Sequence, residues 1–434
     1  MTIGIGLLGL GTVGAGVAEI LTSPAGRHPL VAELELRRIA VRDPNRPRPV
    51  TLAPELLCTD PAEVVNDPSV EIVVEVMGGL EPARTLILAA IAAGKSVVTA
   101  NKAVIARHGE EIADAAARQG VYVLIEAAVG GGIPIIEPLK QSLGGNRIQR
   151  VSGIINGTTN YILTRMTDEG AAYAEVLAEA QSLGYAEADP AADVEGHDAA
   201  DKIAILAGLA YGGSVERSLI PTAGISELQA RDVGYASQLG YRVKLLAVAQ
   251  HLGTEANGEE CLDVRVHPTL VPADHPLAVV NGVNNAILVE GDPVGRVMFY
   301  GPGAGAGPTA SAVVADILNI AGIRQVGGSG GGLDPLLAAS RWRRCRLVES
   351  SRTSHRNYVR LQTNDQAGVI GRIGSCFGQE EVSIQSIVQL EASGGQAEIV
   401  VITHEVEEAR FQAALAAIRA LCEVQSVAAC LRTL

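Results

Sequence analysis

The sequence of 434 residues has few aromatic side chains, no paired cysteines and no excess of positive charge. Aromatic residues make up 3% of the chain and the formal net charge is −14, so the surface offers few stacking platforms and no basic field for nucleic acid. The six cysteines are scattered without a CxxC pair, which disfavours a zinc site or a disulfide scaffold and favours a reducing, cytoplasmic location. Charged residues and glycines interrupt every apolar stretch before it reaches about 18 residues. We therefore expect neither nucleic acid nor a membrane as a partner.

Short apolar runs alternate with Ala-rich helical patterns over about the first 125 residues. Such alternation predicts an α/β domain of the dinucleotide-binding (Rossmann) type, with a parallel sheet and helices on both faces. From about Gly130 the pattern changes to Gly-rich loops, an acidic stretch and β-like segments such as CLDVRVHPTL and NAILVEG, which predict a second domain of the α+β type. The stretch GPGAGAGPTASAVVADILNIAG then returns to a loop and a helix, which we expect to complete the first domain.

The C-terminal 80 or so residues predict a separate unit with the element order βαββαβ, the ferredoxin-like arrangement. The glycine-rich segment VGGSGGGLDP before it is expected to be a flexible linker, and the basic run Arg341–Arg346 a solvated or interface segment. The predicted boundaries are 1–130 for the first domain, completed by about 303–323, then 131–302 for the second, 324–354 for the linker and 355–434 for the third.

A glycine motif directly follows the first predicted strand and opens a helix. In this context the first glycine allows a tight turn, the second lets the backbone approach a pyrophosphate, and the third packs helix on strand, while the helix N-terminus favours an anion. A plain glycine turn is the alternative. The motif predicts a dinucleotide site made by Gly9, Leu10, Gly11, Thr12, Val13 and Gly14.

The end of the second predicted strand, IAVR, bears on the choice of cofactor. An NAD site carries Asp or Glu there to bond the ribose 2′-hydroxyl, whereas this strand ends in Arg42. A guanidinium suits a 2′-phosphate, and Arg46 and Arg48 are near enough in sequence to assist. Asp43 follows at once and keeps NAD open as the alternative. The pattern favours NADP.

Two loops are candidates for ligand contacts. TANK places Lys102 at the carboxyl end of a predicted parallel strand, where ligands bind in open α/β sheets, although a surface lysine is an equal alternative. EAAVGGGIP, residues 126–134, has too many glycines for a strand. This loop could present backbone carbonyls to a hard cation, or it could be a simple hinge.

The stretch DPAADVEGHDAADK, residues 189–202, holds a single lysine among acidic residues. The apolar IAILAGLAYGG follows, so a helix that opens near Asp198 is buried, and Lys202 is expected in its first turn, where a cation opposes the helix dipole. A solvated surface pair between Asp198 and Lys202 is the alternative. Because burial and neighbouring charge tune the protonation of a lysine, this pair predicts chemistry.

These elements together resemble the homoserine dehydrogenase family, in the form that carries a C-terminal ACT regulatory domain, over essentially the whole chain. The most specific match is Ala180-x3-Gly184-Tyr185-Ala186-x2-Asp189-Pro190-x2-Asp193-Val194-x-Gly196-x-Asp198-x3-Lys202, which is similar to the family signature without a gap. The resemblance implies an enzyme that reduces aspartate 4-semialdehyde to homoserine with a nicotinamide cofactor, in threonine, methionine and isoleucine biosynthesis.

Roles for individual residues follow from the resemblance. It implies that Lys202 donates the proton, and that Asp198 and Asp193 orient Lys202 and the substrate. It further implies that Glu187 binds the substrate amino group and that Lys102 is a second active-site lysine. A nearby ammonium suits this reaction because hydride addition builds negative charge on the aldehyde oxygen.

The resemblance also implies cofactor, ion and effector sites. It assigns the cofactor contacts to Gly184, Lys102 and Gly303, and a structural sodium ion to the carbonyls of Glu126, Val129, Gly131 and Ile133. The second domain would bind substrate and dimerise, giving a homo-oligomer, either a dimer or a tetramer. An amino acid such as threonine would bind the ACT domain at Asn364, Asp365 and Gly368, where helix-start amides can accept its carboxylate. A helix cap is the alternative reading of that loop.

Two other functions are compatible with parts of the sequence. One is a catalytically silent amino-acid sensor that keeps the dinucleotide fold, which the intact Lys202, Asp198 and Lys102 disfavour. The other is an oxidoreductase for a different amino acid or semialdehyde. No cysteine lies in a motif suited to thioester chemistry, which disfavours the phosphorylating kind.

Overall fold

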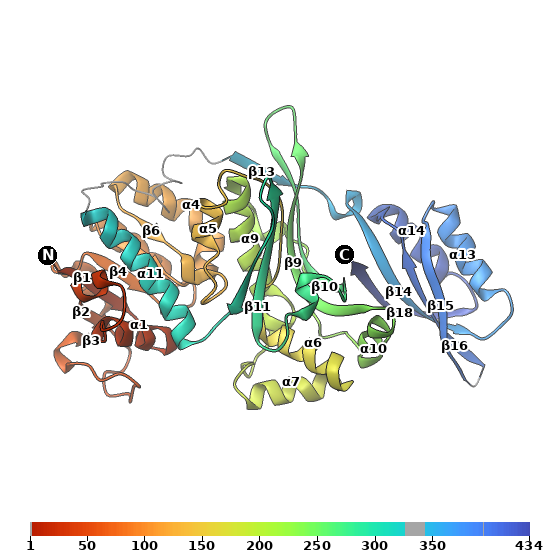
Figure 1. The fold of residues 1–434 in the computed structure, drawn as a ribbon, viewed down its shortest axis with the longest axis horizontal. Helices are drawn as coiled ribbons and strands as arrows, with labels where there is room; N and C mark the ends of the chain where they lie inside the picture. Colours follow the sequence, from red (N-terminus) through yellow and green to blue (C-terminus); the bar gives the residue numbers. More distant parts are fainter. Residues whose placement is uncertain (1, 326–342, 394) are drawn as a thin grey trace.

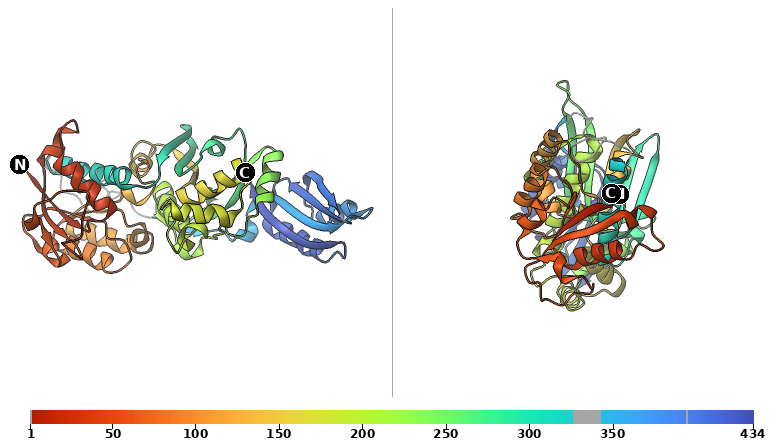
Figure 2. Two further views of the ribbon diagram at one scale, coloured as in Figure 1. Left: turned by 90° about the horizontal axis from the view of Figure 1, so that it is seen from below. Right: turned by 90° about the vertical axis from the view of Figure 1, so that its left-hand side faces the viewer.

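The computed structural model describes residues 2–325, 343–393 and 395–434, which form three regions in a row (Figure 1). The N-terminal parallel sheet lies at one end, a mostly antiparallel sheet lies in the middle, and the C-terminal unit lies at the other end. Figure 2 shows the same row from below and from one end. The fold class predicted from the sequence is confirmed. The glycine linker expected at 326–335 lies outside the described residues.

The first region is a parallel sheet with the strand order β3-β2-β1-β4-β5-β6. Its strands read as nearly continuous apolar runs because helices cover both faces, and every residue of β1 is buried. The strands are β1 (Ile3–Leu8), β2 (Leu34–Ala40), β3 (Leu57–Cys58), β4 (Ile72–Glu75), β5 (Ser96–Thr99) and β6 (Val123–Leu124). The helices between them are α1 (Thr12–Thr22), α2 (Pro61–Asn66), α3 (Ala83–Ala92) and α4 (Lys102–Gln119).

Helix α11 (Ala306–Gln325) returns to this first sheet from the middle of the molecule (Figure 1). By length and composition alone it is apolar enough to cross a membrane. Its Ala310, Val313 and Ile317 are instead buried in one core with Val17 of α1 and Ile5 of β1. Helix α11 therefore acts as a core helix of the first region.

The middle region is built on the strand order β12-β11-β7-β9-β10. Its strands are β7 (Arg147–Ile154), β9 (Tyr241–Thr254), β10 (Glu260–Pro272), β11 (Asn284–Asp292) and β12 (Gly295–Pro302). Its helices are α5 (Ile136–Lys140), α6 (Gly157–Glu169), α7 (Tyr173–Ser182), α8 (Ala191–Val194), α9 (His197–Tyr211) and α10 (Ala230–Gln238). Apolar residues of α6 and α9 share a buried core with alternate residues of β9 and β10, such as Leu245 and Val264.

The C-terminal unit has the predicted βαββαβ order and the sheet order β18-β14-β16-β15. Its elements are β14 (Ser354–Asn364), α13 (Val369–Gln379), β15 (Ile384–Ser393), β16 (Gln396–Thr403), the short β17 (Val406–Glu407), α14 (Glu408–Arg419) and β18 (Val424–Thr433). Its own core is closed by residues such as Phe377 and Phe411.

The sequence predicted a separate unit, but in the structure this unit is continuous with the middle region. Strand β18 pairs in parallel with β10, with Thr269 opposite Arg432 and Leu270 opposite Thr433, so one sheet runs through both. Part of the segment 324–354, expected to be a linker, is also a strand. It is β13 (Arg343–Leu347), which pairs with β10 and with β8 (Gly213–Ser214). Periodicity within a segment could not reveal these partners, because they lie far away in the chain.

Candidate active site

Helix α9 carries the lysine that the sequence singled out. The helix begins at His197, after Gly196 in a left-handed conformation at φ +80°, so Lys202 lies in the second turn and not in the first turn as expected. Lys202 and Asp198 are 8% and 7% exposed, so they do not form a solvated surface pair. The Lys202 Nζ atom donates to Asp198 Oδ2 at 2.7 Å and to the Ile155 carbonyl at 2.7 Å.

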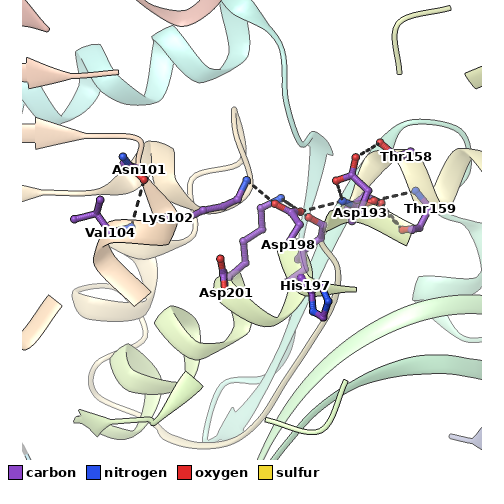
Figure 3. A network of polar contacts seen from close by, with 12 residues as sticks. Asn101, Lys102, Val104, Thr158, Thr159, Asp193, His197, Asp198 and Asp201 are labelled. Atoms are coloured by element: carbon purple, nitrogen blue, oxygen red, sulfur yellow. Dashed lines mark hydrogen bonds and ion pairs between the residues drawn. The ribbon is translucent and has the colours of Figure 1, made fainter. Parts of the chain in front are cut away.

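Lys102 reaches the same carboxylate from the other domain. It is the first residue of α4, at the carboxyl end of β5, and Asn101 before it caps the helix by accepting from the Val104 amide. Lys102 Nζ lies 2.5 Å from Asp198 Oδ1. Asp198 therefore sits between two ammonium groups that come from different domains. Figure 3 shows its contact with Lys102.

Asn156 and Thr158 complete the cluster, and sequence reasoning missed both. Asn156 Nδ2 donates to Asp193 at 2.7 Å and to Asp198 at 3.0 Å, while its Oδ1 accepts from the Thr159 amide and caps α6. Thr158 Oγ1 lies 3.2 Å from Asp193 Oδ2. An Asn before a helix indicates a cap, and nothing local in GTTN indicates a second role toward carboxylates that follow later in the chain.

Burial and neighbouring charge shift the pKa values of Lys202 and Lys102 in opposite directions. Burial lowers the pKa of Lys202, and the nearby Lys102 charge lowers it further, so this pKa stays below its ordinary value although Asp198 opposes the shift. Burial also acts against the charge on Lys102, but Asp198 raises its pKa above the ordinary value. Burial alone would raise the pKa of Asp198, yet the two lysines hold that pKa well below its usual range. Lys202 is thus the lysine more ready to release a proton.

A second ion pair crosses the same domain boundary. Asp201 on α9 lies one turn from Asp198, and its Oδ2 is 3.2 Å from Nη1 of Arg107 on α4. Its Oδ1 is 2.7 Å from Arg217 Nε. Helices α4 and α9 are therefore joined at two points, Lys102–Asp198 and Arg107–Asp201.

Glu187 and Gly184 lie on the exposed turn between α7 and α8. The Glu187 carbonyl accepts from Gln181 Nε2 at 3.1 Å. Among the described residues, no hydrogen bond or ion pair joins the Glu187 carboxylate to the Lys202 cluster. The structure therefore groups Lys202, Asp198, Lys102 and Asp193, and it leaves Glu187 facing solvent nearby.

The glycine motif has the conformation that a dinucleotide site needs. Gly9 has φ +106°, a turn that other residues rarely adopt, and a side chain at Gly14 would collide with the Gly9 carbonyl. Gly11 is exposed, and a Cβ there would meet nothing within 4 Å, so the N-terminus of α1 is open to a ligand. Arg42 is exposed two residues beyond the end of β2.

The loop 126–133 is fixed by its own acidic residue. The Glu126 carboxylate accepts the amides of Ile135, Ile136 and Glu137 at 2.7 to 2.9 Å. Its side chain is thus occupied, which leaves carbonyl groups as the loop's candidate cation ligands. A side chain at Gly131 would collide with the Gly303 backbone, so this loop touches the one that leads into α11.

A buried carboxylate lies against this loop. Asp316 on α11 accepts the Glu126 amide at 2.8 Å, and single oxygens of Glu126, Glu137 and Asp316 lie within 4.8 Å of one another. Burial and the nearby Glu126 charge raise the pKa of Asp316 well above its ordinary value. Asp316 gave no sequence signal, because it stands alone in an apolar helix.

The three residues expected to bind an effector line one cavity of about 290 Å³ at the start of α13. Gly368 is the helix N-cap at φ +89°. Asp365 Oδ1 accepts from Gln389 Nε2 at 3.3 Å, and Asn364 Oδ1 accepts from Gln425 Nε2 at 2.9 Å.

Comparison with known proteins covers nearly the whole chain. Family models match at residues 9–126 (homoserine dehydrogenase, NAD binding domain), 134–318 (homoserine dehydrogenase) and 357–423 (ACT domain). A homoserine dehydrogenase of Synechocystis is 57% identical over 434 residues, covering 100% of both chains. One from Corynebacterium glutamicum is 44% identical over 432 residues, covering 99% of this chain and 95% of its own.

The chain is also similar to solved structures of homoserine dehydrogenases. The crystal structure of a homoserine dehydrogenase from Thiobacillus denitrificans has a TM-score of 0.88 and 41% identity, covering 100% of this chain and 98% of that one. A hyperthermophilic archaeal homoserine dehydrogenase mutant in complex with NADPH has a TM-score of 0.62 and 29% identity, covering 74% of this chain and 98% of that one.

Proposed function

The chain belongs to the homoserine dehydrogenase family, and from that premise we propose that it reduces L-aspartate 4-semialdehyde to L-homoserine with NADPH. The observation that supports this most strongly is Asp198 held between Lys202 and Lys102, in a chain whose dinucleotide motif is open at the N-terminus of α1. The product would serve threonine, methionine and isoleucine synthesis, in the cytoplasm.

In this proposal Lys202 is the general acid. When bound, the reduced nicotinamide supplies a hydride to the aldehyde carbon, which leaves negative charge on the oxygen. Lys202 Nζ stabilises that charge and donates its proton, and its lowered pKa makes the transfer easier. Asp198 keeps Nζ in place through the 2.7 Å bond. Lys102 holds the substrate from the opposite domain.

The substrate's ammonium group needs carboxylates that are not already neutralised by the lysines. Asp193 and Glu187 are the proposed partners. Asn156 holds Asp193 in position without a charge of its own, so the negative charge of Asp193 stays available. Glu187 is exposed and can turn toward a bound substrate.

Arg42 is proposed to bind the 2′-phosphate of NADP. The competing residue, Asp43, is turned into its own loop, where Oδ1 accepts the Asn45 amide at 2.9 Å. Gly184, Lys102 and Gly303 are proposed to complete the cofactor contacts. We expect Arg42→Ala to weaken NADPH far more than NADH in steady-state assays, because NADH lacks the phosphate. Equal loss for both cofactors would refute this role.

A structural sodium ion is proposed at the carbonyls of Glu126, Val129, Gly131 and Ile133. The loop suits the ion, since successive positive φ angles at Gly130 and Gly131 turn the backbone sharply and the Glu126 carboxylate locks the turn. Sodium would hold this loop against the Gly303 loop and takes no part in proton transfer.

Feedback regulation by an amino acid such as threonine is proposed at Asn364, Asp365 and Gly368, and a homo-oligomer, dimer or tetramer, as the working form. Removing the whole ACT domain is a poor test, because it would also strip partners from the buried Asp232 of α10. Asp365→Ala is sharper. We expect it to keep turnover and to lose inhibition by threonine, and unchanged inhibition would contradict the site.

The central experiment is an assay of homoserine oxidation by the purified chain with NADP⁺ and with NAD⁺. Activity with at least one cofactor is expected. A folded protein that turns over homoserine with neither cofactor would contradict the proposed function.

A further inference from the structure

Glu75 is a fully buried carboxylate at the carboxyl end of β4. It is 0% exposed, and it lies between Leu8 at the end of β1 and Thr99 at the end of β5. Among the residues that the structure describes, none forms an ion pair with it. Burying a carboxylate without a cation is costly unless hydrogen bonds compensate for the lost water. The partners of its two oxygens therefore indicate its role.

One oxygen of Glu75 holds the loop that lies against the glycine motif. Glu75 Oε1 accepts the Met77 amide at 2.8 Å and the Gly78 amide at 3.3 Å. Gly78 has φ +75°, so the chain turns sharply at this point. A Cβ at Gly9 would lie 3.0 Å from the Val76 carbonyl oxygen. The loop thus packs directly on the first glycine of the dinucleotide motif.

The other oxygen holds the segment that leads into Lys102. Glu75 Oε2 accepts from the Thr99 hydroxyl at 2.7 Å, and the same hydroxyl oxygen accepts the Asn101 amide at 3.0 Å. Asn101 Nδ2 donates to the Gly79 carbonyl at 2.7 Å, which ties this segment to the loop after β4. Figure 3 shows Asn101 beside Lys102 at the start of α4.

We propose that Glu75 is a positioning residue for the reaction, because it fixes the loop beside the dinucleotide motif and, through Thr99, the segment that carries Lys102. This inference rests on the proposed function. Ligands of open parallel sheets bind at the carboxyl ends of the strands, and Glu75 joins the chain segments that leave two such ends. Lys102 in turn reaches Asp198 in the other domain. An apolar side chain of the same volume would fill the space, so packing alone does not account for a carboxylate here.

Thr99→Val separates the two tasks of Glu75. It removes the hydroxyl and keeps the shape, so the loop after β4 keeps its bonds to Oε1 while the Lys102 segment loses its tie. We expect the KM for the semialdehyde to rise about tenfold, the usual worth of a hydrogen bond to a charged group, with a smaller change in kcat. The Kd for NADPH, from fluorescence titration, should change less than this KM. Thr99→Ser returns the hydroxyl and should restore the wild-type KM.

Glu75→Met removes both acceptor oxygens and keeps the approximate volume of the side chain. We expect it to loosen both segments, so that the Kd for NADPH and the KM for the semialdehyde each rise by about tenfold or more. The NADPH titration needs no turnover, so it reports on Glu75 even in a chain that does not act on homoserine.

Thr403→Val is the matched control for a lost buried hydroxyl. Thr403 of β16 is 0% exposed, and its Oγ1 accepts the Asn357 amide at 3.1 Å, as the Thr99 hydroxyl accepts an amide. Urea melts should show a comparable loss of stability in Thr403→Val, with unchanged kinetic constants.

Two outcomes would overturn the proposal. One is a wild-type KM and a wild-type Kd in both Thr99→Val and Glu75→Met, and the other is a KM in Thr99→Ser as high as in Thr99→Val. Should Thr99→Val fail to fold, the NADPH titration of Glu75→Met decides. A wild-type chain without activity on homoserine would contradict the proposed function, whereas variants with wild-type constants would contradict only the role of Glu75.

Discussion

The middle region is joined to its two neighbours by different kinds of contact. Toward the dinucleotide domain, the joining side chains are Lys102 and Arg107, which are 38% and 39% exposed. Toward the ACT domain, the joining side chain is Arg360 of β14, which is fully buried. Its Nε donates to Asp232 of α10 at 2.6 Å, and its Nη1 donates to Glu398 of β16 at 2.8 Å.

Further bonds reinforce the buried cluster. Arg360 Nη2 donates to Gln229 Oε1 at 2.9 Å, and the Tyr235 hydroxyl donates to Glu398 Oε2 at 2.7 Å. Gln229 and Tyr235 belong to the α10 segment, so the cluster ties that helix to two strands of the ACT sheet. The shared pairing of β10 with β18 lies along the same boundary.

The two junctions differ in the free energy that is needed to open them. Lys102 and Arg107 are half-exposed, and the buried Asp198 and Asp201 each keep a second cation when these pairs separate, so we expect each pair to contribute about 0–1 kcal/mol. Removing one partner from a buried group of charges costs about 3–5 kcal/mol. The first junction, which holds the reacting groups, can open cheaply for cofactor and substrate. The second junction holds the ACT domain against the catalytic fold.

Lys202→Ala should have the largest effect, confined to the first junction. We expect kcat to fall by about 10²- to 10⁴-fold, because the general acid and its charge are lost. Steady-state rates of semialdehyde reduction measure this. Lys202→Arg keeps a charge that does not release its proton near neutral pH, so it should stay impaired. If the kcat of Lys202→Ala were within threefold of the wild-type value, Lys202 would not be the general acid.

Arg360→Met should have the largest effect at the second junction. It leaves Asp232, which is 1% exposed, without its arginine, and we expect the free energy of unfolding to fall by about 3–5 kcal/mol. Urea melts of the full chain measure this, with the exposed Arg352→Met as the matched control. A loss below about 1 kcal/mol would show that the two junctions do not differ as described.

Lys102→Gln tests the role of Lys202 at the first junction through the pH dependence of kcat. In the reduction, Lys202 must be protonated, so turnover falls as pH rises through its pKa. Burial lowers that pKa, and the charge of Lys102 lowers it further, so removing the charge should move the alkaline limb of the kcat profile to higher pH. The absolute rate should drop as well. A limb that moves to lower pH would contradict the assignment.

Arg107→Gln should have the smallest effect. Its partner Asp201 keeps Arg217 at 2.7 Å, so no buried charge is left alone. We expect the free energy of unfolding to change by less than about 1 kcal/mol. Arg217→Gln is the paired comparison and should cost more, because it leaves Asp201 with only the more exposed arginine. The reverse order in urea melts would count against this ranking.

Local patterns in the sequence predicted contacts between near neighbours well. The spacing of Asp198 and Lys202 on a buried helix and the glycines after β1 each depend on residues a few positions apart. The order βαββαβ was likewise readable from periodicity. Such signals fix local geometry, and the fold class follows from their succession along the chain.

Contacts between distant segments could not be predicted in this way. Arg360 and Asp232 are 128 residues apart, and Asn156 and Asp198 are 42 apart. Each of these residues has an ordinary local reading, such as a strand residue, a helix start or a cap. Only the tertiary fold, which brings β14 to α10 and the start of α6 to the start of α9, gives each of them a charged partner.

The pairing of strand β10 limits where residues can be inserted or deleted in related sequences. Strand β10 pairs with β9 on one edge and with β13 and β18 on the other. Leu262, Val264 and Val266 lie in the core, while Asp263 and Arg265, on the opposite face, form an ion pair. A single inserted or deleted residue within β10 would exchange these two faces, since side chains alternate along a strand. The core, the Asp263–Arg265 pair and the attachment of the ACT domain would all be lost together. Length changes among relatives should therefore be tolerated in the exposed turn 255–258 and excluded from 260–272.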